Sequence, residues 1–290
     1  MKIAVGSDIH LEFGDLHIRN TEGADVLILG GDILVAKHFK TDLENRHGAG
    51  NMYRDFIRRC SGEFRHVVAI AGNHEFYGGY WNETLDILRT EYGRHSNVHF
   101  LENDTVTIDG VLFVGATLWT DLNRGNPVTE HIVRSTMNDF DKIRNDEHGY
   151  SKISVMDVKT RNSRSIAHLR DVLANNRDTP TIVVGHHAPS FRGVHPVYDT
   201  ASNHHLNFAY YSSYDEIMHD NPQIKLWTCG HVHHRHRYYV GDTLVVASPR
   251  GYIGIEPQAD NFRLGIVDLH SMPTKDEVDG DYSWETVSTL

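Results

Sequence analysis

Five short apolar runs, each followed at once by polar side chains, constrain the fold of this chain more than any other feature of its sequence. Four of the runs consist almost entirely of Val, Ile, Leu and Ala, and the fifth, at 224–229, reads IKLWTC. Near-continuous apolar runs of this length are typical of strands that are buried on both faces. With their polar ends included, they occupy residues 2–10, 25–32, 66–75, 181–187 and 224–233.

Helical patterns and two hairpins lie between and after these runs. The helical patterns cover residues 51–60, 79–92 and 155–176. Strands that alternate with helices indicate an α/β protein. The hairpins, at 105–116 and 237–248, turn at Asp109-Gly110 and Gly241-Asp242, which are favoured two-residue turns. Residues 262–269 supply a last strand, so we expect mixed sheets rather than purely parallel ones.

The length of 290 residues fits one domain, and we expect a single domain over residues 1–290. Two stretches lack strand patterning, at about 120–165 and 189–213. We interpret both as insertions that cap one end of the sheets.

Composition and charge narrow the class of partner. The formal net charge of −11 argues against wrapping a long nucleic acid, because such a site needs a basic face. It leaves room for a small phosphorylated or nucleotide substrate held by a local positive centre, such as a metal ion. There is no apolar run of about eighteen residues and no secretory signal, so no membrane span is expected. With only Cys60 and Cys229 as thiols, we expect a cytoplasmic protein.

The polar ends of the five runs carry metal-ligand side chains. In open α/β folds, ligands bind beyond the carboxyl ends of the strands, so these side chains should converge. Oxygen and imidazole ligands suit Mn, Fe or Zn, and the set is large enough for two ions. The candidates are Asp8, His10, Asp32, Asn73, one of His186 and His187, His231 and His233.

The spacing of these residues supports convergence. In an extended segment, residues i and i+2 share a face, so Asp8 with His10, and His231 with His233, can point into one cavity. Adjacent residues point in opposite directions, so only one of His186 and His187 should be a ligand.

These blocks in this order resemble the calcineurin-like metallophosphoesterase superfamily. The resemblance rests on Asp8-x-His10, Gly31-Asp32, Gly72-Asn73-His74-Glu75, Gly185-His186 and Gly230-His231-x-His233, and it covers about residues 1–250. It implies two mixed β-sheets packed as a sandwich flanked by helices. It also implies two divalent ions, which we expect to be Mn²⁺, with Fe or Zn as alternatives. By position, one ion would take Asp8, His10, Asp32 and His233, and the other would take Asp32, Asn73, His186 and His231.

The resemblance further implies a hydrolase of phosphate esters in which a metal-bridging hydroxide attacks phosphorus. His74 corresponds to the histidine beside the leaving group, and we expect it to be the general acid. Asp32 is followed by Ile33-Leu34-Val35, where protein phosphatases of this superfamily have an aspartate and an arginine. This departure weakens a phosphoprotein-phosphatase assignment and leaves open which carboxylate orients His74, with Glu75 as one candidate.

We therefore expect a phosphodiesterase acting on a nucleotide-type substrate. A phosphomonoesterase or a nucleotide pyrophosphohydrolase is the alternative, and a non-catalytic scaffold with the same fold is a rival from another class. Arg250 is a candidate for gripping phosphate with its guanidinium fork, with a structural ion pair as the alternative. His205 is a candidate substrate contact from the cap, with a solvated loop residue as the alternative.

Overall fold

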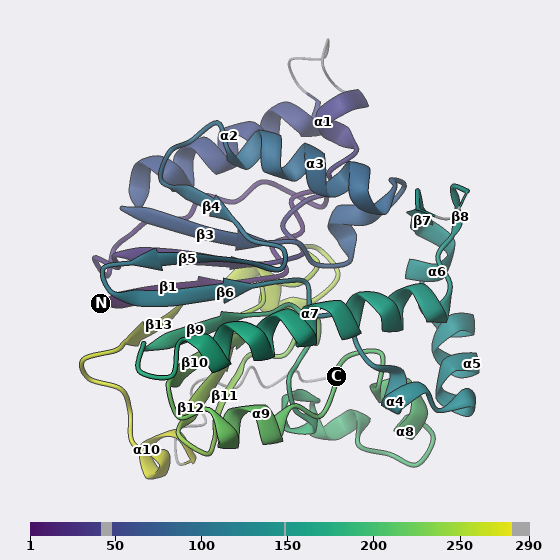
Figure 1. Cartoon of the computed structure of the whole chain (residues 1–290). Helices are drawn as coiled ribbons and strands as arrows, with labels where there is room; N and C mark the ends of the chain where they lie inside the picture. The colour runs from purple at the N-terminus through teal and green to yellow at the C-terminus, as the bar shows by residue number, and fades with distance from the viewer. Residues whose placement is uncertain (42–47, 148, 280–290) are drawn as a thin grey trace.

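Two β-sheets form the centre of the computed structural model, which describes residues 1–41, 48–147 and 149–279 (Figure 1). The first sheet has the strand order β13-β1-β2-β3-β4, with β13 as its antiparallel edge. Its strands are β1 (Lys2–Gly6), β2 (Val26–Gly30), β3 (His66–Ile70), β4 (Val98–Phe100) and β13 (Gly265–Asp268).

The second sheet has the order β11-β12-β10-β9-β6-β5, with antiparallel strands at both edges. Its strands are β5 (Asp104–Ile108), β6 (Val111–Gly115), β9 (Thr181–Val184), β10 (Ile224–Cys229), β11 (His236–Val240) and β12 (Thr243–Ala247). A separate two-stranded ribbon pairs β7 (Arg144–Asn145) with β8 (Ser151–Lys152).

Alternate side chains of the buried strands line two different cores. Ile3 and Val5 of β1 belong to a cluster that also contains Ile182 and Val184 of β9, so this core lies between the sheets. Ala4, from the opposite face of β1, belongs to a cluster with side chains of the first-sheet helices. Because both faces of each central strand are covered, the strands read as continuous apolar runs.

Helices cover the outer faces of both sheets. The clusters place α2 (Ala49–Glu63) and α3 (Trp81–Tyr92) against the first sheet, and α7 (Val155–Asn175) and α9 (Asp215–Asp220) against the second (Figure 1). The remaining α-helices of the described residues are α1 (His38–Thr41), α4 (Leu122–Gly125), α5 (Pro127–Thr136), α6 (Asp139–Lys142), α8 (His204–Asn207) and α10 (Lys275–Asp279). The predicted sandwich of two mixed sheets flanked by helices is confirmed.

Both predicted hairpins are present, as β5–β6 and β11–β12. Asp109 (φ 48°) and Gly110 (φ 82°) both adopt positive φ, as a type I′ turn requires.

The five apolar runs are divided between the sheets, and the two sheets are joined at one point. The carboxyl end of β1 continues into Ser7, which pairs with Pro249 beyond the end of β12. The Ser7 amide donates to Ser248 O (3.1 Å), and the Arg250 amide donates to Ser7 O (3.0 Å). This junction brings the carboxyl ends of the strands of both sheets to one place. The polar residues that follow these strands can therefore converge although they belong to two sheets and not to a single open sheet.

The two segments interpreted as insertions pack against each other. Residues 120–165 contain α4, α5, α6 and the β7–β8 ribbon, and residues 189–213 contain α8. Nδ1 of His205 in α8 lies 2.9 Å from Oγ1 of Thr129 in α5, and the Asp121 amide donates to Ser212 Oγ (2.9 Å). In Figure 1 these helices lie at the right, at the end of the molecule opposite the start of β1. None of the helices in the described ranges combines the length and apolar composition needed to cross a bilayer.

Candidate metal centre

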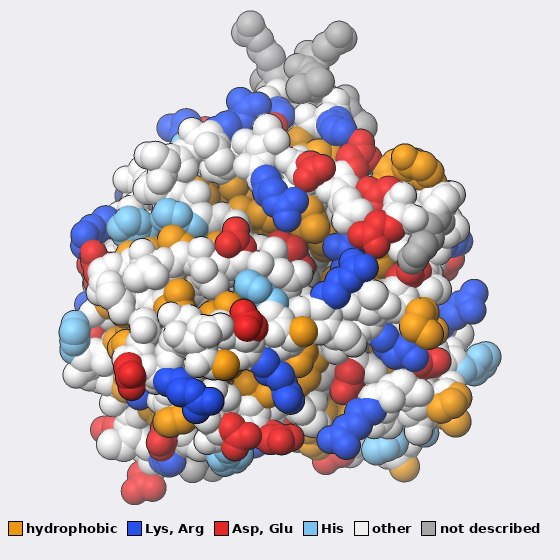
Figure 2. Space-filling view, in the orientation of Figure 1, with side chains coloured by type: hydrophobic (Ala, Val, Ile, Leu, Met, Phe, Trp, Pro, Cys, Tyr) orange, Lys and Arg blue, Asp and Glu red, His pale blue; other side chains and the backbone are white. Residues whose placement is uncertain are grey.

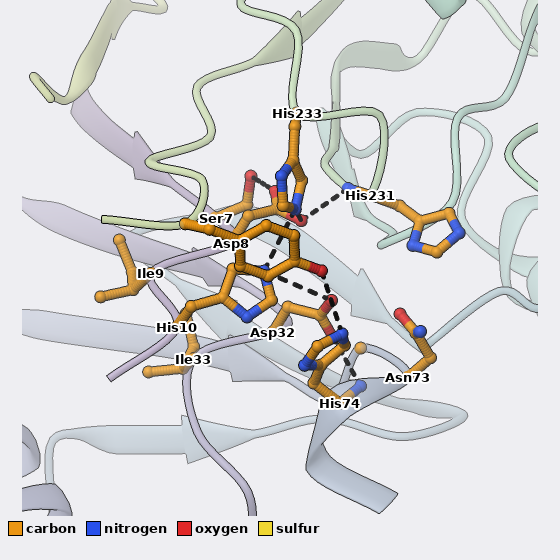
Figure 3. Close-up of polar contacts among 12 residues, drawn as sticks. Ser7, Asp8, Ile9, His10, Asp32, Ile33, Asn73, His74, His231 and His233 are labelled. Carbon is orange, nitrogen blue, oxygen red and sulfur yellow. Dashed lines mark hydrogen bonds and ion pairs between the residues drawn. The ribbon is translucent and has the colours of Figure 1, made fainter. Parts of the chain in front are cut away.

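Side chains from the ends of five strands converge in one buried cluster, and Figure 3 shows those that follow β1, β2, β3 and β10. Three overlapping groups have ligand atoms within 4.8 Å of one another: Asp8 with His10 and His233, His10 with Asp32 and His74, and Asp32 with His186 and His231. Oδ2 of Asp32 lies 3.9 Å from Nε2 of His10 and 3.4 Å from Nε2 of His186. Asp32 therefore stands between the two ends of the cluster.

Left-handed backbone, rather than extended backbone, points these side chains inward. Asp8 (φ 51°), His10 (φ 49°), Asp32 (φ 54°), His231 (φ 66°) and His233 (φ 47°) all have positive φ. The expectation that Asp8 and His10 share a face of an extended segment is therefore wrong, because β1 ends at Gly6. Positive φ in residues other than glycine is costly and is concentrated at functional sites.

Hydrogen bonds between loops hold this unusual backbone. The Asp8 amide donates to Gly31 O (2.9 Å) and the His10 amide donates to Asp32 O (3.0 Å), so the loop after β1 is paired with the loop after β2. The His231 amide donates to Asp8 Oδ1 (2.8 Å), which ties in the loop after β10.

Two glycines leave room for the carboxylates. A Cβ at position 72 would lie 2.2 Å from Asp32 Oδ1, and a Cβ at position 230 would lie 2.4 Å from Asp8 Oδ2. A side chain at either position would displace the carboxylate that the cluster needs.

The imidazoles are oriented by hydrogen bonds at their Nδ1 atoms. Nδ1 of His10 lies 3.1 Å from Glu12 Oε1, Nδ1 of His233 lies 2.8 Å from Glu256 Oε2, and Nδ1 of His186 lies 2.9 Å from Gly30 O. With Nδ1–H donating in each ring, Nε2 is left with a lone pair that faces the cluster.

The inward-facing atoms are suited to a cation. Nε2 of His10 and Nε2 of His233 are 3.1 Å apart, although both are acceptors when the rings are neutral. Nε2 of His231 is buried and has no hydrogen-bond partner among the residues that the structure describes. Burial and the neighbouring His187 hold the pKa of His231 well below its usual range, so this ring is in the neutral form that binds metal. Converging lone pairs and buried carboxylates fit divalent metal ions.

The charges of the carboxylates dominate the electrostatics of the cluster. Burial disfavours charged His186, but the charge of Asp32 outweighs it and raises the pKa of His186 to about 10. The pKa of His74 is raised to about 9, because Asp32 and Glu12 outweigh the effect of burial. The buried carboxylates are thus stabilised by positive charge close to them. A bound cation would supply this charge in place of protons on the imidazole rings.

Glu12, and not Glu75, contacts the imidazole of His74. Nδ1 of His74 lies 3.0 Å from Glu12 Oε1, the same oxygen that His10 approaches. On its other side, Nε2 of His74 lies 3.3 Å from the hydroxyl of Tyr252. The suggestion that Glu75 orients His74 is therefore wrong.

Glu75 instead joins two loops from inside the protein. Its side chain is 1% exposed and accepts hydrogen bonds from the amides of Asp32 (2.9 Å), Ile33 (2.7 Å) and Gly72 (2.7 Å). It thereby fixes the loops that carry Asp32 and Asn73.

Asn73 is oriented by the first insertion. Its Nδ2 donates to Oδ1 of Asp139 in α6 (2.8 Å), and its Oδ1 faces His186 Nε2 (3.2 Å). The amide oxygen is therefore the atom that points into the cluster.

Three other residues considered from the sequence lie outside this cluster. His187 is buried, with its ring centroid 4.4 Å from that of His231 and 5.3 Å from Trp119. His205 contacts Thr129, as described above. Arg250 is only 2% exposed, and its guanidinium donates to the carbonyl oxygens of Ile9 (3.0 Å), Gly14 (2.8 Å) and Asp15 (3.2 Å). The guanidinium that was predicted to grip phosphate is therefore occupied by the backbone, and Arg250 makes no ion pair within the described ranges.

Sequence reasoning missed Glu12, Asp139, Tyr252 and Glu256. Glu12 continues the alternation of Asp8 and His10, which is a signal that could have found it. The other three are single polar or aromatic residues whose role depends on how distant loops meet.

Comparisons with known proteins agree with this geometry. The family model described as calcineurin-like phosphoesterase matches residues 1–235. An uncharacterised protein of Acanthamoeba polyphaga mimivirus is 25% identical over 215 residues, which is 69% of this chain and 72% of that protein.

Two solved structures share the fold. The phosphopantetheinyl hydrolase of Mycobacterium tuberculosis is similar with a TM-score of 0.68 and 15% identity, over 94% of this chain and 98% of that one. A dimetal phosphatase from Danio rerio is similar with a TM-score of 0.56 and 12% identity, over 93% of this chain and 92% of that one.

Proposed function

The chain belongs to the calcineurin-like phosphoesterase family and is a metal-dependent phosphoric ester hydrolase, and we propose that its substrate is a phosphodiester of nucleotide type. The choice of a diester over a monoester rests on the position of Arg250. A phosphomonoester dianion presents terminal oxygens that a guanidinium commonly binds. Here that guanidinium is occupied by three backbone carbonyls.

Aromatic rings at both ends of the cluster support the nucleotide class. The Tyr252 ring centroid lies 4.5 Å from that of His10, and the Tyr210 ring centroid lies 5.0 Å from that of His231. Tyrosine rings in these positions offer planar apolar surface to a base. On the face shown in Figure 2, basic and acidic side chains are interspersed, which favours a small substrate over an extended nucleic acid.

The ligand sets form the next part of the proposal. Asp8, His10, Asp32 and His233 would hold one divalent ion, and Asp32, Asn73, His186 and His231 would hold the other. Oxygen and imidazole donors favour Mn²⁺, with Fe or Zn as alternatives. When bound, such ions neutralise the phosphoryl oxygens and lower the pKa of water toward neutrality.

His74 completes the proposed mechanism as the general acid. Glu12 holds its Nδ1–H, so its Nε2 is the atom available to deliver a proton to the leaving oxygen. The carboxylate of Glu12 also stabilises the ring while it is charged.

Turnover of paired substrates tests this function. Protein loaded with Mn²⁺ should hydrolyse bis-p-nitrophenyl phosphate with a higher kcat/KM than p-nitrophenyl phosphate. A panel of nucleoside diesters and a phosphopantetheinyl diester then identifies the class. His74→Asn should keep its metal and lose turnover, and Asp32→Ala should lose metal at both positions. A preference for the monoester would overturn the assignment, and so would faster hydrolysis of nucleotide pyrophosphates.

A further inference from the structure

Beside His74, two segments from distant parts of the chain form one aromatic surface. Phe13 comes from the loop after β1, and Tyr252 comes from the loop after β12. Their ring centroids lie 4.9 Å apart, with an angle of 50° between the ring planes. Phe13 is 44% exposed and Tyr252 is half-buried, so the surface is open to a ligand. We call these two side chains the aromatic wall.

The aromatic wall is held rigidly. The bonds from Arg250 to the carbonyls of Ile9, Gly14 and Asp15 fix the loop that carries Phe13. The amide of Gly251 donates to Asp8 O (3.0 Å), which fixes the start of the loop that carries Tyr252. Binding surfaces that are ordered in advance lose less entropy when a ligand arrives.

The aromatic wall begins at the proposed general acid. The Tyr252 hydroxyl lies 3.3 Å from Nε2 of His74, and the Tyr252 ring centroid lies 4.6 Å from that of His233. Phe13 continues the surface outward, and Ile255 of the same loop as Tyr252 is 67% exposed. A leaving group that receives its proton from Nε2 of His74 would therefore lie against the wall.

Charges around the aromatic wall disfavour an anionic leaving group. The carboxylate of Glu12 lies between His10 and His74, and that of Glu256 accepts from the Tyr252 amide (2.8 Å). The nearby guanidinium of Arg250 is turned to backbone carbonyls, as described above. A phosphate in the leaving group would meet two carboxylates here.

We propose that the aromatic wall is the leaving-group subsite and that it selects an uncharged planar group, such as a nucleoside or an aryl alcohol. The proposal rests on phosphodiester hydrolysis with His74 as the acid. It distinguishes this chemistry from cleavage of a nucleotide pyrophosphate, whose leaving group itself carries a phosphate.

Methyl aryl phosphodiesters test the subsite, because the aryloxide leaves and the methyl group is retained. Three leaving groups are compared with Mn²⁺-loaded protein: 4-nitrophenolate, 4-nitro-1-naphtholate and 3-carboxy-4-nitrophenolate. Because they differ in acidity, each kcat/KM is divided by the rate of uncatalysed hydrolysis of the same diester before the three are compared. We expect kcat/KM to be roughly 3- to 10-fold higher for the naphthyl than for the phenyl diester, from added ring contact. The carboxylated diester should be the slowest of the three.

Variants of the aromatic wall then locate the preference. Phe13→Ala should abolish the naphthyl preference and retain its metal content and Tm, since Phe13 is partly exposed. Phe13→Leu, which keeps an apolar but not a planar side chain, should retain only part of it. Tyr150→Ala is the matched control, because Tyr150 is an exposed aromatic residue (59%) in the turn between β7 and β8. It should keep the full preference.

The outcomes separate the two proposals. Diester hydrolysis with no naphthyl preference, or with a preference that survives in Phe13→Ala, overturns the subsite and leaves the proposed function standing. Failure of the wild-type protein to hydrolyse any of the three diesters overturns the proposed function and the subsite with it.

Discussion

At the scale of single residues, one carboxylate serves two histidines with different proposed roles. Glu12 accepts from His10, a candidate metal ligand, and from His74, the proposed acid. Burial opposes the charged form of Glu12, but the hydrogen bonds from His10 and His74 outweigh this and lower its pKa to about 2. The ligand and the acid are therefore positioned by a single charged group.

Glu12→Gln should lower kcat by about 10- to 100-fold at saturating Mn²⁺, the usual effect of removing a carboxylate behind a ligand histidine. Poor leaving groups should suffer most, because they depend on the proton from His74. Steady-state kinetics on diesters with leaving groups of different acidity make the comparison. Glu22→Gln, at an exposed carboxylate, is the control and should behave as wild type. An unchanged kcat in Glu12→Gln would refute the coupling.

Glu75→Gln should lower the stability of the fold rather than disturb His74, the proposed general acid. Burial and the charge of Asp32 raise the pKa of Glu75, and the amides of Ile33 and Gly72 counteract this by donating to the carboxylate. A glutamine replaces one acceptor oxygen with an NH₂ group that faces N–H donors. We expect the free energy of unfolding to fall by about 2–4 kcal/mol, measured by urea denaturation. A stability equal to that of wild type would show that the two loops are held by other contacts.

The positions of the candidate ligands could be predicted from the sequence, but their backbone could not. The apolar runs indicated where each strand ends, and the polar residues after them had to lie there. The positive φ of Asp8 and of His10 is stabilised by hydrogen bonds from their own amides, which donate to Gly31 O and Asp32 O. Those partners belong to another loop, so a local sequence pattern carries no information about them.

At the scale of secondary-structure elements, α4 is a left-handed turn. Leu122 (φ 51°), Asn123 (φ 57°), Arg124 (φ 56°) and Gly125 (φ 77°) all have positive φ. The left-handed region costs about 1–2 kcal/mol for each residue that bears a Cβ, so this turn is strained. It lies at the start of the first insertion, directly before the Asn126 cap of α5.

Replacing Arg124 tests this strain. Arg124→Gly removes the Cβ that opposes positive φ, and we expect the free energy of unfolding to rise by up to about 1 kcal/mol. Arg134→Gly is the matched control, because Arg134 is exposed in the right-handed helix α5. It should instead lower stability by about 1 kcal/mol. Opposite signs in thermal unfolding support the left-handed turn, and destabilisation of equal size in both variants would contradict it.

The same scale shows why the strands were easier to predict than their arrangement. A hairpin turn such as Asp109-Gly110 is a signal contained in the local sequence. Both predicted hairpins, β5–β6 and β11–β12, are present in the structure. The division of the apolar runs between two sheets depends on the junction of Ser7 with Pro249, which lie far apart in the sequence. Only the family resemblance implied a sandwich.

At the scale of the whole molecule, the buried cluster should link metal binding to stability. Asp8, His10 and His186 are 0% exposed and Asp32 is 1% exposed. Without cations, the charge of the carboxylates would have to be balanced by protons on buried imidazoles, whose charged form burial disfavours.

Chelation of the metal ions should therefore lower Tm. An ion present at one hundred times its Kd contributes about 2.7 kcal/mol, so we expect a fall of roughly 5–10 °C. Differential scanning fluorimetry before and after EDTA treatment measures it, with elemental analysis confirming removal. Asp32→Asn is the control, since it lacks the shared ligand and should show a much smaller shift. An unchanged Tm in metal-free wild-type protein would rule out this linkage.

The hydrogen bond from Asn73 to Asp139 limits which segments can be exchanged by recombination between this protein and its homologues. Asp139 lies in the segment 120–165, which lacks the strand pattern of the rest of the chain. This segment would be an obvious choice for exchange between homologous proteins. A recombinant chimera that replaced this segment would remove the acceptor that holds the Asn73 amide, whose oxygen would no longer be fixed toward the centre. The segment is therefore not an independent module, and successful recombination would have to carry a carboxylate at the position of Asp139.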